Sequence, residues 1–189
     1  MSENKGSQSI VAAAGIMGVF AFCVLWMIAV FADASWAFEE NFISDLGVSD
    51  SDTARAAFTL GCIITGAVLA LYGVSKAWNG KSAVAASGVF IILAGVFLAL
   101  IGVFNQDAGD IHDYVSYLFD ICILLGAVIG AIADYKKGNA LFAATAGGLV
   151  VISFASYFML TYEGFDVVAA ICMLAWFTIE CIKAGLGKS

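Results

Sequence analysis

The sequence predicts an all-α, polytopic membrane protein, a six-transmembrane-helix bundle with both termini in the cytoplasm. Three observations support this prediction: the composition, six long apolar runs, and the placement of the lysines. Apolar residues make up 62% of the chain and charged residues only 12%, whereas a soluble domain is roughly half apolar and about a quarter charged. This composition excludes a soluble enzyme, a nucleic-acid-binding module and a disordered chain.

The apolar runs give the predicted spans. They cover about residues 10–31, 54–78, 83–104, 114–133, 140–160 and 167–182, and a spanning helix needs about 20 residues. Residues 33–52 mix acids with aromatic side chains, a pattern typical of a segment lying in the outer membrane interface. The other connections are short, so sequential helices should be antiparallel neighbours. We therefore expect residues 1–189 to form a single transmembrane domain.

The charged residues predict the orientation of the bundle. Seven of the eight basic residues fall on the side of the termini, namely Lys5, Lys76, Lys81, Lys136, Lys137, Lys183 and Lys188. The positive-inside rule then places both termini in the cytoplasm, and we expect the cell (plasma) membrane as the location. Twelve of the fifteen acids fall on the outer side. This acidic rim either concentrates cations or reflects only the need of loops for polar residues.

Small residues indicate how the helices pack. The span at 83–104 carries Gly88, Gly95 and Gly102, spaced by seven, which keeps them near one face and allows a neighbouring backbone to approach. Similar pairs are Gly15 with Gly18, Gly126 with Gly130, and Ala143 with Gly147. The five cysteines all lie inside predicted spans and form no CxxC pair, so we interpret them as apolar packing residues.

The span at 114–133 opens with the most informative polar residues. His112, Ser116 and Asp120 are spaced by four and so share one helix face. Asp120 should lie about 12 Å below His112, at a depth where a carboxylate must face the bundle or a wet cavity. We expect Arg55 or a proton as its partner. Either a functional site or a structural hydrogen bond to a neighbouring helix would explain an acid in this position.

A second polar group follows the first span. Ser44 and Asp45 sit between apolar residues that should pin them to the bundle, while Ser51 or Asp52 should cap the second helix. We predict one outward-facing, solvent-reachable pocket that binds a ligand through Ser44, Asp45, Arg55, His112, Ser116 and Asp120. A metal, if one binds, would be held loosely by His112, Asp113 and Asp45. We expect no cofactor and no nucleic-acid partner.

Three segments carry a resemblance to a known family. "NFISDLG", "FTLGCIITG" and "GVFNQDAGDIHDYVSYLFD" resemble the family named domain of unknown function 998, small six-helix membrane proteins of archaea and bacteria. Its motifs map to Ile43, Ser44, Asp45, Leu46 and Gly47, and to Gly102, Val103, Phe104 and His112. The chain lacks the prolines often found beside both motifs, and Thr59 stands where the family often has Asn. The resemblance implies a six-helix fold and a polar outer site, and no activity.

Three functions from different classes are compatible with these features. The first is binding of a cation, a lipid headgroup or a small molecule at the acidic outer pocket, with transport as an extension. The second is a structural or partner subunit of a membrane complex, or a homo-oligomer, assembled through its glycine faces. The third is an intramembrane lipid hydrolase using Ser44, His112 and an Asp, although no nucleophile-elbow sequence accompanies them. We favour binding, then assembly; an enzyme is the least favoured. Membrane lipids are expected partners in every case.

Overall fold

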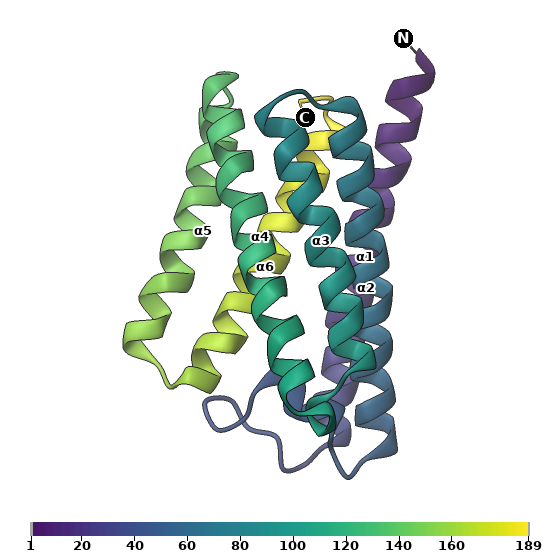
Figure 1. The fold of residues 1–189 in the computed structure, drawn as a ribbon, viewed down its shortest axis with the longest axis vertical. Helices are drawn as coiled ribbons and strands as arrows, with labels where there is room; N and C mark the ends of the chain where they lie inside the picture. Colours follow the sequence, from purple (N-terminus) through teal and green to yellow (C-terminus); the bar gives the residue numbers. More distant parts are fainter. Residues whose placement is uncertain (1, 189) are drawn as a thin grey trace.

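The computed structural model describes residues 2–188, except for the side chains of residues 2–5 and 7, so the predicted topology signal Lys5 lies outside the described side chains. Over this range the chain forms six long helices, all long and apolar enough to cross a membrane (Figure 1). They are α1 (Ser2–Ala32), α2 (Asp52–Asn79), α3 (Ala83–Val103), α4 (Asp110–Lys136), α5 (Ala140–Met159) and α6 (Tyr162–Gly185). Two short 3-10 helices, η1 (Ile43–Gly47) and η2 (Gln106–Ala108), lie in the connections. The predicted six-helix bundle is confirmed.

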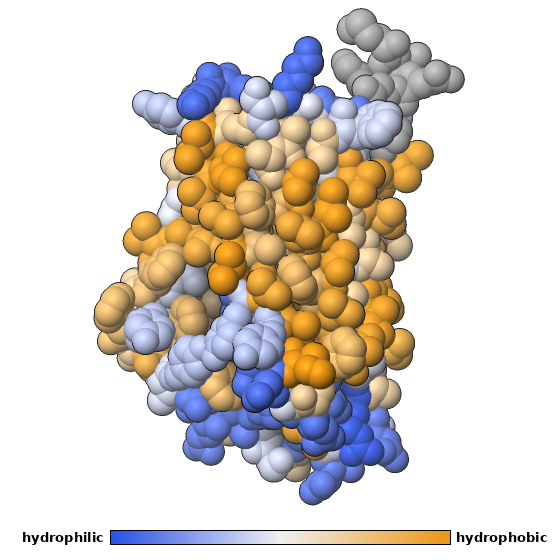
Figure 2. Space-filling model, in the orientation of Figure 1, coloured by the Kyte–Doolittle hydropathy of each residue, from blue (hydrophilic) through white to orange (hydrophobic). Residues whose placement is uncertain are grey.

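The bundle has two different ends. Both termini lie at one end, here called the terminal end, and η1 lies at the other, here called the η1 end. On the face shown in Figure 2, an apolar belt lies between polar residues at both ends. A belt of this kind is what a protein surface needs to sit in the hydrocarbon of a bilayer.

Helices α2 and α6 begin before the apolar runs that predicted them, because a polar residue caps each of them. The hydroxyl of Ser51 accepts a hydrogen bond from the backbone N–H of Ala54 at 3.3 Å, which confirms the predicted cap of α2. The hydroxyl of Thr161 accepts from the N–H of Gly164 at 3.0 Å and starts α6. α6 therefore begins five residues before the predicted span, and Asp166 lies inside this helix.

Helices α2 and α3 approach each other backbone to backbone. A Cβ atom added at Gly95 would lie 2.5 Å from both the Gly66 carbonyl oxygen and the Ala70 nitrogen, and one at Gly88 would lie 2.5 Å from the Ala77 nitrogen. The predicted glycine stripe of this helix is thus a packing face. Gly147 of α5 differs, since no atom lies within 4 Å of its added Cβ in the described part of the chain.

The helix α5 stands at the edge of the bundle, beside α4 and α6. Its only buried side chains within the described range are Ala146 and Ser156. The other helices enclose two apolar clusters, one around Leu69 and Phe177 and one around Leu46 and Phe58. Because α5 packs mainly on its two neighbours, it bounds whatever space lies between α4 and α6.

Four charged side chains lie buried inside the terminal end. Lys76 of α2 pairs with Glu180 of α6, and Lys183 pairs with both Glu180 and Asp134 of α4. None of the four is more than 7% exposed. The sequence analysis used Lys76 and Lys183 only as topology signals on the side of the termini, and the structure places both inside helices and in the protein core. The network tolerates burial because its two positive and two negative charges cancel and each charge has a partner.

Candidate functional site

The segment "ISDLG" forms η1 and closes one end of the bundle. Asp45 holds its start, because its carboxylate accepts hydrogen bonds from the Phe42 N–H at 2.9 Å and from the Asn41 side chain at 3.3 Å. Ile43 and Leu46 are buried in the core. A Cβ atom at Gly47 would lie 2.9 Å from the Phe58 ring, so this position favours glycine. Asp45 is therefore a residue that organises the closing segment.

The α3–α4 connection is hydrogen-bonded to η1. The Asn105 amide donates to the Gly47 carbonyl oxygen at 3.1 Å, and the Gln106 amide donates to the Ser44 hydroxyl at 3.0 Å and to Asp45. The two motifs that carry the family resemblance are thus neighbours in space. Ser44 and Asp45, two of the predicted site residues, take part in this contact between η1 and the α3–α4 connection.

Arg55 lies on the surface rather than in a pocket. Its guanidinium pairs with Asp52 and donates to the Ser49 carbonyl oxygen. The Arg55 side chain is 41% exposed and that of Asp52 is 94% exposed. The expected ion pair between Arg55 and Asp120 is not formed, because Arg55 finds a partner three residues earlier on its own helix.

His112 is buried at the start of α4 and 5% exposed. Its Nδ1 lies 2.8 Å from the Phe104 carbonyl oxygen. A carbonyl oxygen only accepts, so Nδ1 carries the proton of this hydrogen bond. His112 therefore ties the start of α4 to the end of α3, which accounts for a histidine beside the Gly-Val-Phe segment.

The hydroxyl of Ser44 and the ring of His112 have separate partners, Gln106 and Phe104, and no described hydrogen bond joins the two residues. Asp113 is exposed near the start of α4, and Ser116 is partly buried one turn further on. Among the described residues no three His, Cys, Asp or Glu side chains gather to hold a metal ion. The set His112, Asp113 and Asp45 is thus not assembled as a metal centre here.

A cavity of about 310 Å³ lies between α4, α5 and α6. Most of its wall is apolar, including Phe119, Phe154, Phe165 and Trp176. The space-filling surface is hollowed beside α5 within the apolar belt. Of the predicted site residues only Asp120 lines this cavity.

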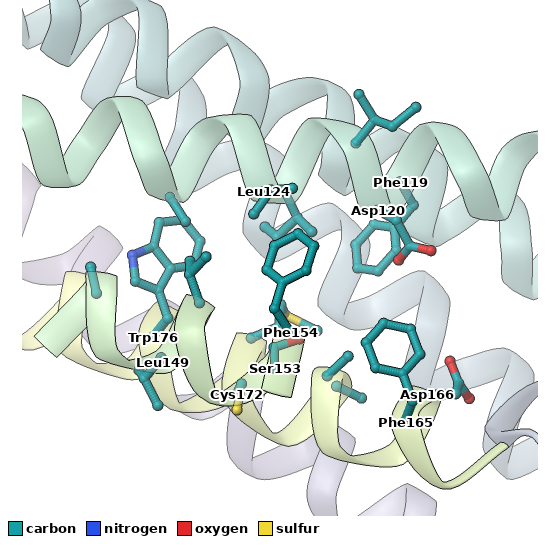
Figure 3. Close-up of a pocket in the computed structure, with 18 residues that line it drawn as sticks. Phe119, Asp120, Leu124, Leu149, Ser153, Phe154, Phe165, Asp166, Cys172 and Trp176 are labelled. Atoms are coloured by element: carbon teal, nitrogen blue, oxygen red, sulfur yellow. The ribbon is translucent and has the colours of Figure 1, made fainter. Parts of the chain in front are cut away.

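Asp120 and Asp166 occupy one end of the cavity, and Trp176 lies toward the other (Figure 3). The two carboxylates are close enough for their charges to interact. The carboxylate of Asp166 also accepts a hydrogen bond from the backbone N–H of Ile43 at 3.0 Å, so it lies between the closing segment and the cavity. Within the described residues no cation pairs with either acid, and no hydrogen bond reaches Asp120. The cavity thus combines an apolar body with an uncompensated acidic end.

Sequence reasoning missed Asp166 as a site residue because the sixth span was predicted to begin at residue 167. The signal was present: Thr161 is a good N-cap, and Glu163 follows in the position of an acidic first turn. A helix start at Thr161 would have placed Asp166 one turn inside the membrane helix. Asp120, by contrast, was found because it interrupts an apolar run.

Fold and site together define a small multi-pass membrane protein with a polar closing segment and an intramembrane cavity. The family model described as "Protein of unknown function (DUF998)" matches residues 16–183. The chain belongs to this family, as the resemblance predicted, and the match extends through α6. No curated protein and no solved structure matches the chain.

Proposed function

We propose that the protein binds a single-chain amphiphile with a cationic head in the cavity between α4, α5 and α6. The observation that carries the proposal is the pair Asp120 and Asp166, two carboxylates without a protein cation at one end of an apolar cavity. An ionised carboxylate inside a membrane needs a counter-charge or a proton. An ammonium head would supply that charge, and its alkyl chain would contact the apolar wall.

The aromatic residues of this end favour a cation as well. Phe119 and Phe165 line the cavity beside the acids. Phe165 packs on Tyr162 and Tyr157, with ring centroids 6.0 and 5.4 Å apart. Aromatic faces attract ammonium groups, most strongly where water is excluded. The cavity volume also lies at the lower end of the range of small-molecule sites, which begins at about 300 Å³.

A fluorescent alkylamine tests the proposal in phosphatidylcholine nanodiscs that contain the full chain. Asp120→Asn removes one charge and breaks no described hydrogen bond, so it should weaken binding about tenfold or more at unchanged stability. Asp113→Asn is the matched control, because Asp113 is an acid on the same helix that does not line the cavity. Ala169→Phe, which narrows the cavity, should also reduce binding.

The charge and the shape of the ligand can be tested separately. A fluorescent fatty acid of the same length carries a negative head, and we expect it to bind weakly to the unaltered protein. Equal binding of amine and acid, or equal effects of the Asp120→Asn and Asp113→Asn substitutions, would contradict a cation site. Unchanged binding in the Ala169→Phe variant would show that the amine binds outside this cavity.

The proposal includes an orientation. The seven lysines assigned to the side of the termini support cytoplasmic termini in the cell membrane. The acidic end of the cavity lies toward the η1 end, and so would lie in the outer leaflet. The amphiphile would then enter from the outer leaflet with its head near the membrane surface.

A specific feature of α5 supports assembly with a partner subunit or a second copy as the other candidate function. Among the described residues, no atom lies within 4 Å of a Cβ added at Gly147 or Gly148, whereas Cβ atoms added at Gly66 and Gly73 of α2 or at Gly88 and Gly95 of α3 would meet neighbouring backbone. Small residues on an open membrane-helix face allow close contact with another helix. Gly148→Leu should abolish a dimer or complex detected by native mass spectrometry. A monomer in the unaltered protein, with no partner co-purified from its membrane, would remove this candidate.

A further inference from the structure

A second cavity, of about 270 Å³, lies at the terminal end, far from the acidic one. It is formed by α1, α2, the α2–α3 connection, the start of α3, the α4–α5 connection and the end of α6. Three lysines line it: Lys76, Lys81 and Lys137. The two cavities share no lining residue. Their chemistry is opposite, because one is acidic and the other basic.

The charges around this second cavity do not cancel. Lys76 is buried and belongs to the neutral network with Glu180, Lys183 and Asp134. Lys81 and Lys137 are exposed and form no ion pair among the described residues. They therefore leave the cavity with an excess of positive charge, whereas the charge of Lys76 is balanced by its network.

Uncharged polar groups complete the wall. Ser75 and Asn79 line the cavity, and Tyr72 donates its hydroxyl to the Glu180 carbonyl oxygen at 3.0 Å. Helix α3 begins at this cavity, with Val84 of its first turn in the wall. The N-terminal end of a helix carries a partial positive charge, which adds to that of the lysines. The ammonium groups of Lys81 and Lys137 supply both hydrogen-bond donors and positive charge, the pattern that recognises phosphate.

We propose that this cavity binds a phosphate-bearing anion, with Lys81 and Lys137 as its principal contacts and Lys76 at its floor. The ligand is either the headgroup of an anionic phospholipid or a soluble phosphate compound. Basic pockets between membrane helices at a lysine-rich end are suited to anionic headgroups. This site is separate from the amphiphile cavity, and it stands if the proposed function fails.

The test uses the full chain in phosphatidylcholine nanodiscs and has two arms. The first measures binding of a fluorescent phosphatidylglycerol against a fluorescent phosphatidylcholine of the same chain length. The second measures thermal stabilisation by inorganic phosphate and by glycerol 3-phosphate, with chloride at equal ionic strength as the reference. Preferential binding in the first arm identifies a lipid headgroup, and stabilisation in the second alone identifies a soluble phosphate.

Charge-neutral variants connect either signal to this cavity. Lys81→Gln/Lys137→Gln should weaken binding about tenfold or more, because each lysine near a membrane surface contributes about 1 kcal/mol of attraction to an anionic lipid. Lys136→Gln/Lys188→Gln is the matched control, with the same change of net charge at the same end and outside the cavity lining. Both pairs are exposed, so folding should survive. No preference in either arm, or equal loss in both double variants, would overturn the proposal.

Discussion

Asp166 of α6 accepts a hydrogen bond from the backbone N–H of Ile43, with 3.0 Å between nitrogen and Oδ2. The same carboxylate lines the cavity between α4, α5 and α6. It therefore joins the closing segment to the cavity, although Ile43 and Asp166 lie 123 positions apart in the sequence. Any charge placed beside Asp166 in the cavity acts on a group that also holds η1 in place.

Asp45→Ala should destabilise the closing segment. It removes the acceptor for the Phe42 N–H and leaves the Gln106 amide with one partner fewer. Loss of such a cap costs about 1–2 kcal/mol. Thermal unfolding in detergent should show a lower Tm. Asp50→Ala is the control, because Asp50 is exposed and outside this network. An equal Tm in the two variants would show that Asp45 does not organise the segment.

Gly95→Ala should destabilise the bundle. The new methyl group would lie 2.5 Å from backbone atoms of α2, and backbone cannot move aside as a flexible side chain can. Overpacking of this kind costs about 1–3 kcal/mol. Gly147→Ala adds the same methyl group in open space and should leave the Tm unchanged or slightly raised. The comparison fails if Gly95→Ala is tolerated as well as Gly147→Ala.

The buried charge network predicts strong non-additivity. Lys76→Met alone should cost about 3–5 kcal/mol, because it leaves a net negative charge among Glu180, Lys183 and Asp134. Lys76→Met/Glu180→Gln leaves a neutral core with the ion pair between Lys183 and Asp134, which are 2.6 Å apart. The double variant should therefore lose less unfolding free energy than the two single variants lose in sum. Simple additivity would mean that the four charges act independently.

The proposed orientation predicts which positions a membrane-impermeant maleimide reaches in intact cells. Asp107→Cys, at the η1 end, should be labelled from outside, whereas Asn79→Cys, at the terminal end, should react only after the membrane is opened. The native cysteines lie inside spans and four of the five are buried, so their background should be low. Labelling of residue 79 in intact cells would contradict this orientation and would place the termini outside the cell.

The sequence predicted the fold better than the site, for a physical reason. The hydrocarbon interior of a bilayer requires long apolar helices. The number of spans and the glycine packing faces can therefore be predicted from short stretches of sequence. The cavity depends on where α5 and α6 diverge, and no local pattern records that. Asp120 was found by its depth in an apolar run, but Asp166 was missed with the true start of α6. Arg55 was expected to face inward, and a nearer carboxylate on its own helix holds it at the surface.

The burial of two lysines was not predicted, for a related reason. Lys76 and Lys183 stand near the ends of apolar runs, where lysine side chains ordinarily reach the membrane surface. Each is buried because an acid from another helix neutralises it, and that pairing involves positions far apart in sequence, such as Lys183 with Asp134. The only local signal was the i,i+3 spacing of Glu180 and Lys183, which puts both on one helix face.

The burial of Lys76 and Lys183 also means that the charges exposed to the membrane differ before and after folding. During insertion the separate helices still carry these charges near their ends, where they add to the bias that orients each hairpin. Once the helices assemble, the same charges are cancelled inside the bundle and no longer act on the lipid. We therefore expect these two residues to act first on insertion and then on the stability of the finished core, where the structure shows them paired. A substitution at either position should then affect both, and the two effects would have to be measured separately.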